Sequence, residues 1–82
     1  MNWAESRRLA LITKAVYPIG TRVRAVFIDD INAPPKGMEG VVTHVDDIGT
    51  VFVHWDEPGY VSGVVVADGT DKLAIIYDEE KK

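Results

Sequence analysis

The segment "VVTHVDDIGTVFVHW", residues 41–55, constrains the fold of this 82-residue chain more than any other. Two runs rich in valine and aromatic residues flank "DDIG", which suits a type I turn followed by Gly49 in the left-handed conformation. Pairing Asp46 with Thr50 then places the odd-numbered residues of both runs on one face, and nearly all of them are apolar. The segment therefore predicts a β-hairpin whose inward residues are Val41, Thr43, Val45, Val51, Val53 and Trp55.

The same two-residue period predicts the other strands, with turn residues between them. Residues 21–28 alternate, with the inward set Val23, Ala25 and Phe27 and the outward set Val26 and Ile28. After the hairpin, Pro58 and Gly59 suit the centre of a type II turn. Two further strands are predicted over residues 60–66 and 72–77.

Five short strands separated by turns are typical of a small closed barrel. A long loop after the first strand, a tight hairpin and a short fifth strand favour an SH3-like barrel over an OB-fold, whose strands are usually longer. Stability has to come from burial, because the chain has no cysteine for disulfides or thiolate metal sites. The predicted fold class is mainly β: a small five-stranded SH3-like barrel preceded by one N-terminal α-helix.

The first residues of the chain predict this helix. Asn2 and Glu5 have the spacing of a capping box, which starts a helix at the next residue. The helix should run over residues 3–16 and end there, because Tyr17 precedes Pro18 and is pushed out of the helical region.

The predicted outer face of the barrel is unusually apolar. Besides Val26 and Ile28 of the first strand, Val42 and Phe52 point outward in the predicted hairpin register. Contiguous apolar patches of this kind are uncommon on monomers. We expect the apolar arc of the helix to cover the patch, and that arc consists of Leu9, Ile12 and Val16. A partner protein or a second copy of the chain is the alternative cover.

These patterns divide the chain into an N-terminal helix over residues 1–17, a small β-barrel domain over residues 18–77 and a flexible tail over residues 78–82. No apolar run approaches the roughly 20 residues of a membrane span. The N-terminus lacks the continuous apolar region of a secretory signal. We therefore expect a cytoplasmic protein without membrane contact.

Charge is distributed unevenly along the chain. Residues 1–24 contain five Lys or Arg and one Glu, whereas residues 25–82 contain four Lys and twelve Asp or Glu. The basic N-terminal part could meet an anionic partner or dock on its own acidic domain. The candidate phosphate contacts in that part are Arg7, Lys14, Arg22 and Arg24. The acidic remainder would repel phosphate, which weighs against a nucleic-acid partner.

The residues that could carry chemistry have simpler explanations. His44 and His54 share the predicted outer face, but a zinc site needs three or four protein ligands, so we expect solvated histidines and no metal. The pairs Asp29-Asp30 and Asp46-Asp47 fall at turns, where aspartate caps backbone amides. The sequence contains no convincing nucleophile–base pair and no glycine-rich phosphate loop. We expect no enzyme activity and no cofactor.

The stretches "YPIGTRVR" and "APPKGMEGVVTHVDDIGT", followed by "VHWD", resemble a family of short bacterial and phage domains of unknown function. The resemblance covers residues 17–77 and leaves the N-terminal helix outside. It implies a compact SH3-like barrel without known catalysis, and it supplies no functional residues. Residues 63–73 form a longer region than is usual in this family. The hairpin is also loosely similar to the KOW motif of ribosomal and transcription-elongation proteins.

The function predicted by exclusion is a non-catalytic binding or accessory module that contacts another protein. The candidate partner-binding residues are those of the reverse face of the hairpin and of the barrel rim, namely Val42, His44, Phe52, His54, Trp55 and Tyr60. Core packing is the simplest interpretation of Trp55, and the alternative is a stacking platform that it forms with Tyr60 at the barrel rim. A nucleic-acid-binding module that uses the basic helix and the first strand is the alternative function. The expected assembly is a monomer or a weak homodimer.

Overall fold

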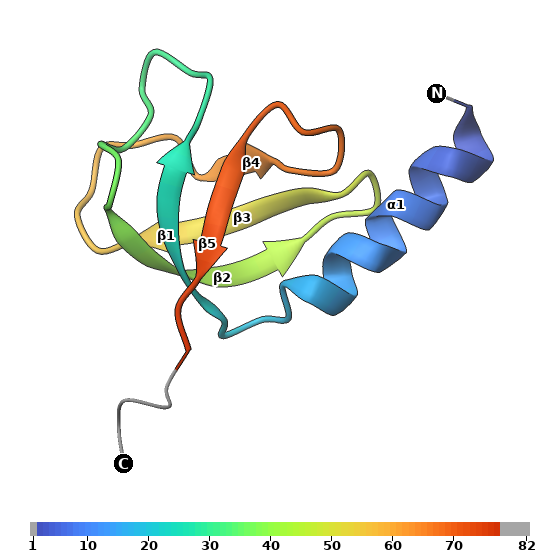
Figure 1. Ribbon diagram of the computed structural model, residues 1–82, viewed down its shortest axis with the longest axis horizontal. Coiled ribbons are helices and arrows are strands. Elements are labelled where there is room, and N and C mark those ends of the chain that lie inside the picture. Colours follow the sequence, from blue (N-terminus) through green and yellow to red (C-terminus); the bar gives the residue numbers. More distant parts are fainter. Residues whose placement is uncertain (1, 78–82) are drawn as a thin grey trace.

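The computed structural model describes residues 2–77 as one helix followed by five strands (Figure 1). The elements are α1 (Trp3–Val16), β1 (Arg22–Phe27), β2 (Glu39–Val45), β3 (Thr50–Trp55), β4 (Gly63–Val65) and β5 (Lys72–Ile75). Each predicted element is present, although β4 is limited to three residues. The predicted tail, residues 78–82, lies outside the described residues.

Helix α1 begins and ends where its sequence predicts. The Asn2 side chain accepts a hydrogen bond from the Glu5 backbone N–H at 2.9 Å, and the Glu5 carboxylate accepts one from the Asn2 N–H at 3.4 Å. These two bonds form the predicted capping box. At the other end the Tyr17 N–H donates to the Thr13 carbonyl at 2.9 Å, and Pro18 then stops the helix. Local sequence accounts for both ends.

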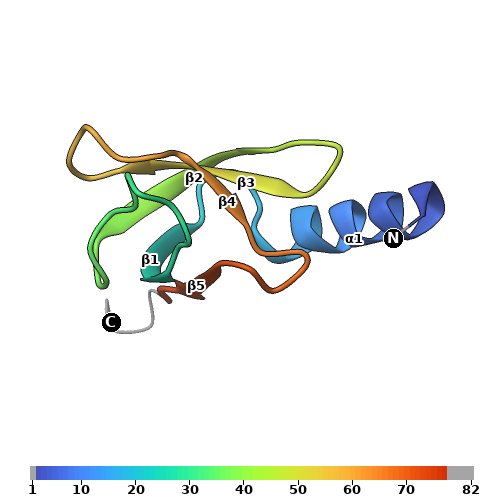
Figure 2. The ribbon, with the colours of Figure 1, turned by 90° about the horizontal axis from the view of Figure 1, so that it is seen from above.

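The five strands form one antiparallel sheet in the order β4-β3-β2-β1-β5. The sheet bends so that β1 and β5 lie below β2 and β3 in Figure 2, with the apolar core between them. The predicted fold class, mainly β with one helix before five strands, is confirmed. The predicted closure of the barrel is wrong, because β4 and β5 stay unpaired with each other in the described part of the chain. The core consists of Val23, Ala25, Ile28, Val42, Val45, Val51, Val53, Trp55 and Val64.

The turn between β2 and β3 has the predicted chemistry. Gly49 has a φ of +87°, the left-handed conformation that favours glycine. The Asp46 carboxylate accepts hydrogen bonds from the backbone N–H groups of Ile48 at 3.1 Å and Thr50 at 2.8 Å. Asp30 accepts a bond from a backbone amide of its own loop at 2.7 Å. Asp46 and Asp30 are therefore turn residues, as predicted.

A β-bulge in β2 changes which hairpin residues face the core. Next to the turn the predicted pairing is confirmed, with His44 opposite Phe52. Past Thr43 the register shifts by one residue. As a result Val42 is buried, with 1% of its surface exposed, whereas Val41 is half-buried and Thr43 is exposed. The predicted inward positions of Val41 and Thr43 and the outward position of Val42 were wrong, because one extra residue reverses the alternation.

A second irregularity lies in β1. Its register with β5 shifts between Ala25 and Phe27. Phe27 is therefore 55% exposed, while Ile28 is buried in the core. Both positions are the reverse of the prediction, again because a one-residue shift exchanges the two faces of a strand. Val26, predicted to point outward, is exposed.

Helix α1 projects beyond the sheet instead of lying across it (Figures 1 and 2). Its buried residues are Ala10 and Thr13. The backbone of Ala10 lies against Gly49 of the hairpin turn, 3.5 Å from where a β-carbon on that glycine would be. The helix is thus held at the turn end of the hairpin.

The predicted cover of the sheet by Leu9, Ile12 and Val16 was wrong. Ile12 and Val16 are exposed, and Leu9 is half-buried. The physical reason is that Ile28 and Val42, which the helix was to cover, are already buried in the core of the sheet.

Asp71 is a buried charged residue at the place where a barrel would close. Its carboxylate accepts hydrogen bonds from the backbone N–H groups of Asp29 and Val65, each at 2.8 Å. Its own N–H donates to the Val65 carbonyl at 2.9 Å. Asp71 therefore joins the end of β4 to the end of β1. In the sequence it cannot be distinguished from the other turn aspartates.

Candidate binding surface at helix α1 and the hairpin turn

A groove of about 340 Å³ lies between helix α1 and the turn that joins β2 to β3. The helix contributes Trp3, Arg7 and Leu11 to its lining, and the turn contributes Asp47 and Ile48. Leu11 is 59% exposed and Ile48 is 72% exposed. The groove therefore presents apolar side chains from two elements that are far apart in the sequence.

The charged side chains of this groove connect its two walls. The Lys14 Nζ lies 3.0 Å from the Asp47 Oδ1, so the helix and the turn share an ion pair. The hydrogen bond from Lys14, and then its charge, lower the pKa of the Asp47 carboxyl group. Asp47 is exposed to water, so this pair adds little to stability. Along the helix, the Arg7 guanidinium carbon lies 5.4 Å from the centre of the Trp3 ring, a cation–π contact.

A second groove of about 350 Å³ lies at the C-terminal end of the helix. Lys14 lines both grooves, and Ile19 and His44 line only the second one. The His44 ring stacks on Phe52 across the hairpin, with ring centres 5.9 Å apart. Tyr17 also lines this groove, and its pKa is raised by burial and further by the nearby Tyr77.

Two of the residues predicted for partner binding are not accessible. Val42 and Trp55 belong to the core, and the Trp55 Nε1–H donates to the Val61 carbonyl at 2.8 Å. Core packing, the simplest interpretation of Trp55, is confirmed. Tyr60 packs against the same core and is partly buried. Trp55 and Tyr60 therefore do not form an exposed stacking platform.

The other predicted residues lie on the outer face of the hairpin. His44 pairs with Phe52 in the ladder, while His54 pairs with Val41 instead of Val42 because of the bulge. Both histidines are exposed. Within residues 2–77, the structure does not group three side chains that could hold a metal ion.

The four predicted phosphate contacts are divided between two places. Arg7 and Lys14 line the first groove, whereas Arg22 and Arg24 lie on β1. Both places belong to the basic N-terminal part of the chain, but the structure does not bring the four side chains together.

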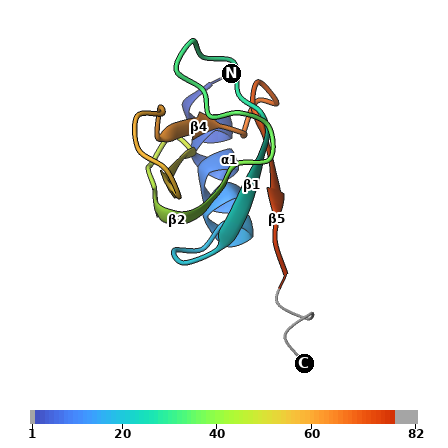
Figure 3. The ribbon, with the colours of Figure 1, turned by 90° about the vertical axis from the view of Figure 1, so that its left-hand side faces the viewer.

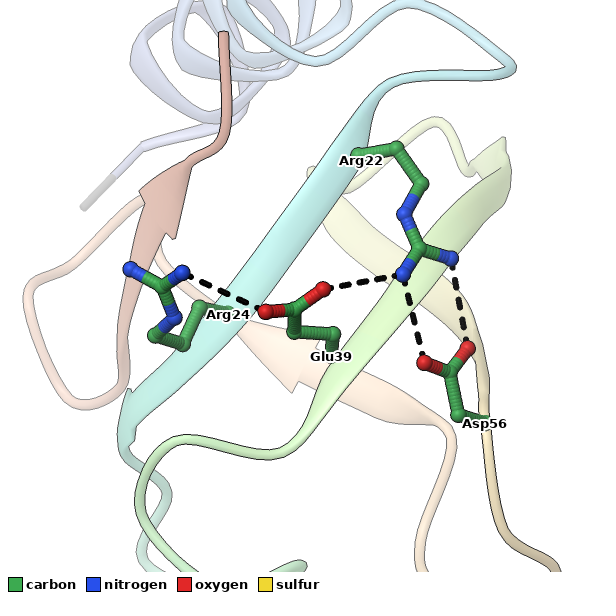
Figure 4. A network of polar contacts seen from close by, with 4 residues as sticks. All are labelled: Arg22, Arg24, Glu39 and Asp56. Atoms are coloured by element: carbon green, nitrogen blue, oxygen red, sulfur yellow. Dashed lines mark hydrogen bonds and ion pairs between the residues drawn. The ribbon is translucent and has the colours of Figure 1, made fainter. Parts of the chain in front are cut away.

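The two arginines of β1 belong to a network of ion pairs (Figure 4). Arg22 forms two bonds of 3.2 Å with the two oxygens of Asp56 and one of 3.0 Å with Glu39. Arg24 contacts the other Glu39 oxygen at 3.2 Å. The bonds to Asp56, followed by those to Glu39, raise the pKa of Arg22. Two cations and two carboxylates face one another here, so the network offers little net charge to phosphate.

Sequence reasoning missed the apolar residues that line the grooves. Leu11 and Ile48 were not among the predicted site residues, and neither was Ile19. Ile48 does carry a signal, because it is an apolar residue at the centre of a turn, where polar residues are common. Leu11 carries none, since an apolar residue in an amphipathic helix is ordinarily expected to pack on its own domain.

Helix α1, the helix that the described residues form, is neither long nor apolar enough to cross a membrane. No curated protein and no solved structure matches the chain. A family model described as Domain of unknown function (DUF4314) matches residues 5–76. The match includes most of helix α1, which the resemblance noted in the sequence had placed outside. With nearly its whole length covered, the chain belongs to this family of domains of unknown function.

Proposed function

We propose that this chain is a non-catalytic binding or accessory module that contacts another protein through helix α1 and the hairpin turn. The observation that carries the proposal is the exposure of apolar side chains on the helix. Leu11 and Ile12 are each more than half exposed, although the sheet core lies nearby. Fully burying an exposed side chain of this size contributes about 1.5–3 kcal/mol, and the exposed half of each side chain leaves part of this to a partner.

The charges of the molecule indicate what kind of partner segment fits. Helix α1 carries Arg7, Arg8 and Lys14 against Glu5. Residues 18–77 instead hold four Lys or Arg and nine Asp or Glu. An acidic segment is therefore attracted to the helix and repelled by the rest of the domain. We expect the partner to be an amphipathic helix with apolar residues along one side and acidic residues beside them.

Polar side chains that form hydrogen bonds and ion pairs within the fold support a role without catalysis. Asp46 and Asp71 accept backbone hydrogen bonds within the fold. Arg22 and Arg24 pair with Glu39 and Asp56 on the sheet. These groups maintain the structure and are not aimed at a common reacting centre.

Nucleic-acid binding is the alternative that an experiment has to separate from this proposal. The stacked Trp3 and Arg7, with Lys14 nearby, combine an aromatic ring with positive charge, as in single-strand binding sites. The paired state of Arg22 and Arg24 and the acidic surface of the domain oppose it.

Titration of the ¹⁵N-labelled protein with a synthetic acidic amphipathic helical peptide tests the proposal. We expect the amide signals of Leu11, Ile12 and Ile48 to shift. The substitution Leu11→Asp should weaken peptide binding about tenfold or more, because it removes a central apolar contact and adds repulsion. The matched control is Ile31→Asp, which changes an exposed apolar residue in the loop between β1 and β2 and should leave binding unchanged.

A parallel titration uses a single-stranded oligonucleotide at low salt. Under the proposal it leaves the signals of Trp3, Arg7 and Lys14 in place. If the oligonucleotide shifts the signals of Trp3, Arg7 and Lys14 while the peptide shifts none, the protein-binding role is wrong and the nucleic-acid role is favoured.

A further inference from the structure

The two edges of the sheet differ in how much of their hydrogen-bonding capacity is used. Strand β4 has three residues, and the N–H of Val65 donates to the buried Asp71 carboxylate. A short strand whose edge is partly occupied is a poor template for further pairing. Strand β5 pairs with β1 on one side. Figure 3 shows its other side facing away from the rest of the sheet.

Within residues 2–77 no other strand pairs with this edge, and the hydrogen-bond pattern identifies the groups on it. The Ile76 N–H donates to the Arg22 carbonyl at 2.9 Å, so pairing with β1 continues one residue beyond β5. Alternate residues of an antiparallel strand direct their backbone groups to opposite sides. The N–H and C=O groups of Leu73, Ile75 and Tyr77 therefore point toward the free edge.

The sequence of this edge does nothing to prevent pairing. The run "LAIIY", residues 73–77, contains no charge, proline or glycine. Natural edge strands are usually blocked by such residues, by bulges or by a covering segment. Lys72 comes directly before the run, and Asp78, Glu79 and Glu80 follow it in the sequence.

We propose that β5 pairs with β5 of a second copy of this chain, antiparallel and about a two-fold axis at Ile75. This register sets Leu73 of one copy opposite Tyr77 of the other and Ile75 opposite its own equivalent. It satisfies the outward backbone groups of all three residues in both copies. The sheets of the two copies then form one continuous sheet.

The charged residues before and after β5 in the sequence favour a second copy of this chain as the partner, and they favour the antiparallel orientation. Antiparallel pairing brings the Lys72 end of each strand to the end of the other that continues into the acidic residues 78–80. Parallel pairing would set like charges side by side. An isologous two-fold contact needs such self-complementarity, which this strand has. The surface is separate from the groove at helix α1, so the proposal does not depend on the proposed function.

Single-cysteine variants test the register directly, because the chain has no cysteine of its own. In the proposed pair, the two copies of residue 75 have Cα atoms about 5.5 Å apart, within disulfide range. Ile75→Cys should therefore form a disulfide-linked dimer under mild oxidation. Leu73→Cys is the matched control, since its two copies lie about 13 Å apart along the strands and should not link. Circular dichroism checks that both variants fold.

Sedimentation equilibrium supplies a second test that leaves the core untouched. The wild-type chain should dimerise reversibly between about 10 μM and 1 mM, as expected for a small interface. Tyr77→Pro removes one outward N–H per copy and should weaken the dimer about tenfold. Tyr77→Ala keeps the N–H of this exposed residue and should weaken it less.

A wild-type chain that stays monomeric at about 1 mM would overturn the proposal. So would disulfide linking through Leu73→Cys, or through Ile12→Cys on helix α1, in place of Ile75→Cys. Linking through Ile12→Cys would show instead that the helix surface of the proposed function meets a second copy.

Discussion

The β2–β3 hairpin and helix α1 are both strongly specified by their local sequences, yet they differ in what their apolar residues do. The inward residues of the hairpin, such as Val51 and Val53, are almost completely buried. Leu11 and Ile12 of the helix remain more than half exposed. An amphipathic pattern therefore indicates that an element has an apolar side, but it does not indicate that the same chain covers it.

The difference follows from which residues occupy the core. The bulge in β2 turns Val42 inward, and the irregularity in β1 does the same for Ile28. The strands and the residue after β1 thus supply the whole core. Helix α1 keeps a small contact at Ala10 and Thr13 and directs other apolar residues to solvent.

The largest expected difference in stability is between a substitution in the hairpin core and one on the exposed surface of helix α1. Trp55→Ala should lower the free energy of unfolding by about 3–5 kcal/mol, because it leaves a cavity in the core and removes the bond to the Val61 carbonyl. Leu11→Ala should change it by less than about 0.5 kcal/mol, as expected for an exposed residue. Urea denaturation followed by fluorescence and circular dichroism measures both. A large loss with Leu11→Ala would show that the helix side is buried within the folded chain.

A second prediction concerns the polar bond that holds the sheet where a barrel would close. Asp71→Ala should lower the free energy of unfolding by about 1.5–3 kcal/mol, because two backbone N–H groups lose a charged acceptor. Asp68→Ala is the matched control, since Asp68 is exposed and accepts a bond from Thr70 in its own turn. Equal effects of the two changes in urea denaturation would contradict the structural role of Asp71.

Deletion of residues 2–16 tests whether the sheet folds without helix α1. The truncated chain keeps Tyr17, which packs against the core. It should still unfold cooperatively. Its free energy of unfolding should be only about 1 kcal/mol lower, which is roughly the contribution of one buried methyl group. Calorimetry measures this loss. A truncated chain that fails to fold would show that α1 is an integral part of the core.

The smallest effect concerns the ion pair between the two regions. Lys14 lowers the pKa of Asp47. The pair therefore stabilises the folded chain at pH values above the pKa of aspartate in the unfolded chain. That contribution is lost as the pH falls through the lower pKa of the folded state. In Lys14→Met, the pKa of Asp47 should rise toward its ordinary value, as followed by NMR of the side-chain carboxyl carbon. An unchanged pKa would mean that the pair does not connect helix and turn in solution.

The part of the candidate surface that could be predicted is small. His44 was predicted on the outer face of the hairpin, and it lines the second groove. Arg7 and Lys14 were predicted as basic contacts, and they line the first groove. Leu11 and Ile48 could not be selected from the sequence, because their exposure depends on how the helix packs against the hairpin turn. Val42 was selected and lies in the core, since its accessibility depends on the register of the sheet. Trp55 was predicted to point inward, and it does.

Features that depend on neighbours in the chain were determined by the sequence alone. The capping box of Asn2 and Glu5 starts α1, Pro18 stops it, and Gly49 with Asp46 sets the hairpin turn. Each of these involves contacts within a few residues, so the local pattern contains all the necessary information.

Features that depend on distant segments required the folded structure. The burial of Asp71 between β1 and β4 and the pairing of Arg22 with Asp56 connect residues that are far apart in the sequence. The bulge at Thr43 shifts the register of β2 with β3 by one residue. The free edge of β5 and the exposed side of α1 belong to the same class. Both depend on how residues of the strands fill the core and leave the helix at its margin, which is a competition for space that no local pattern records.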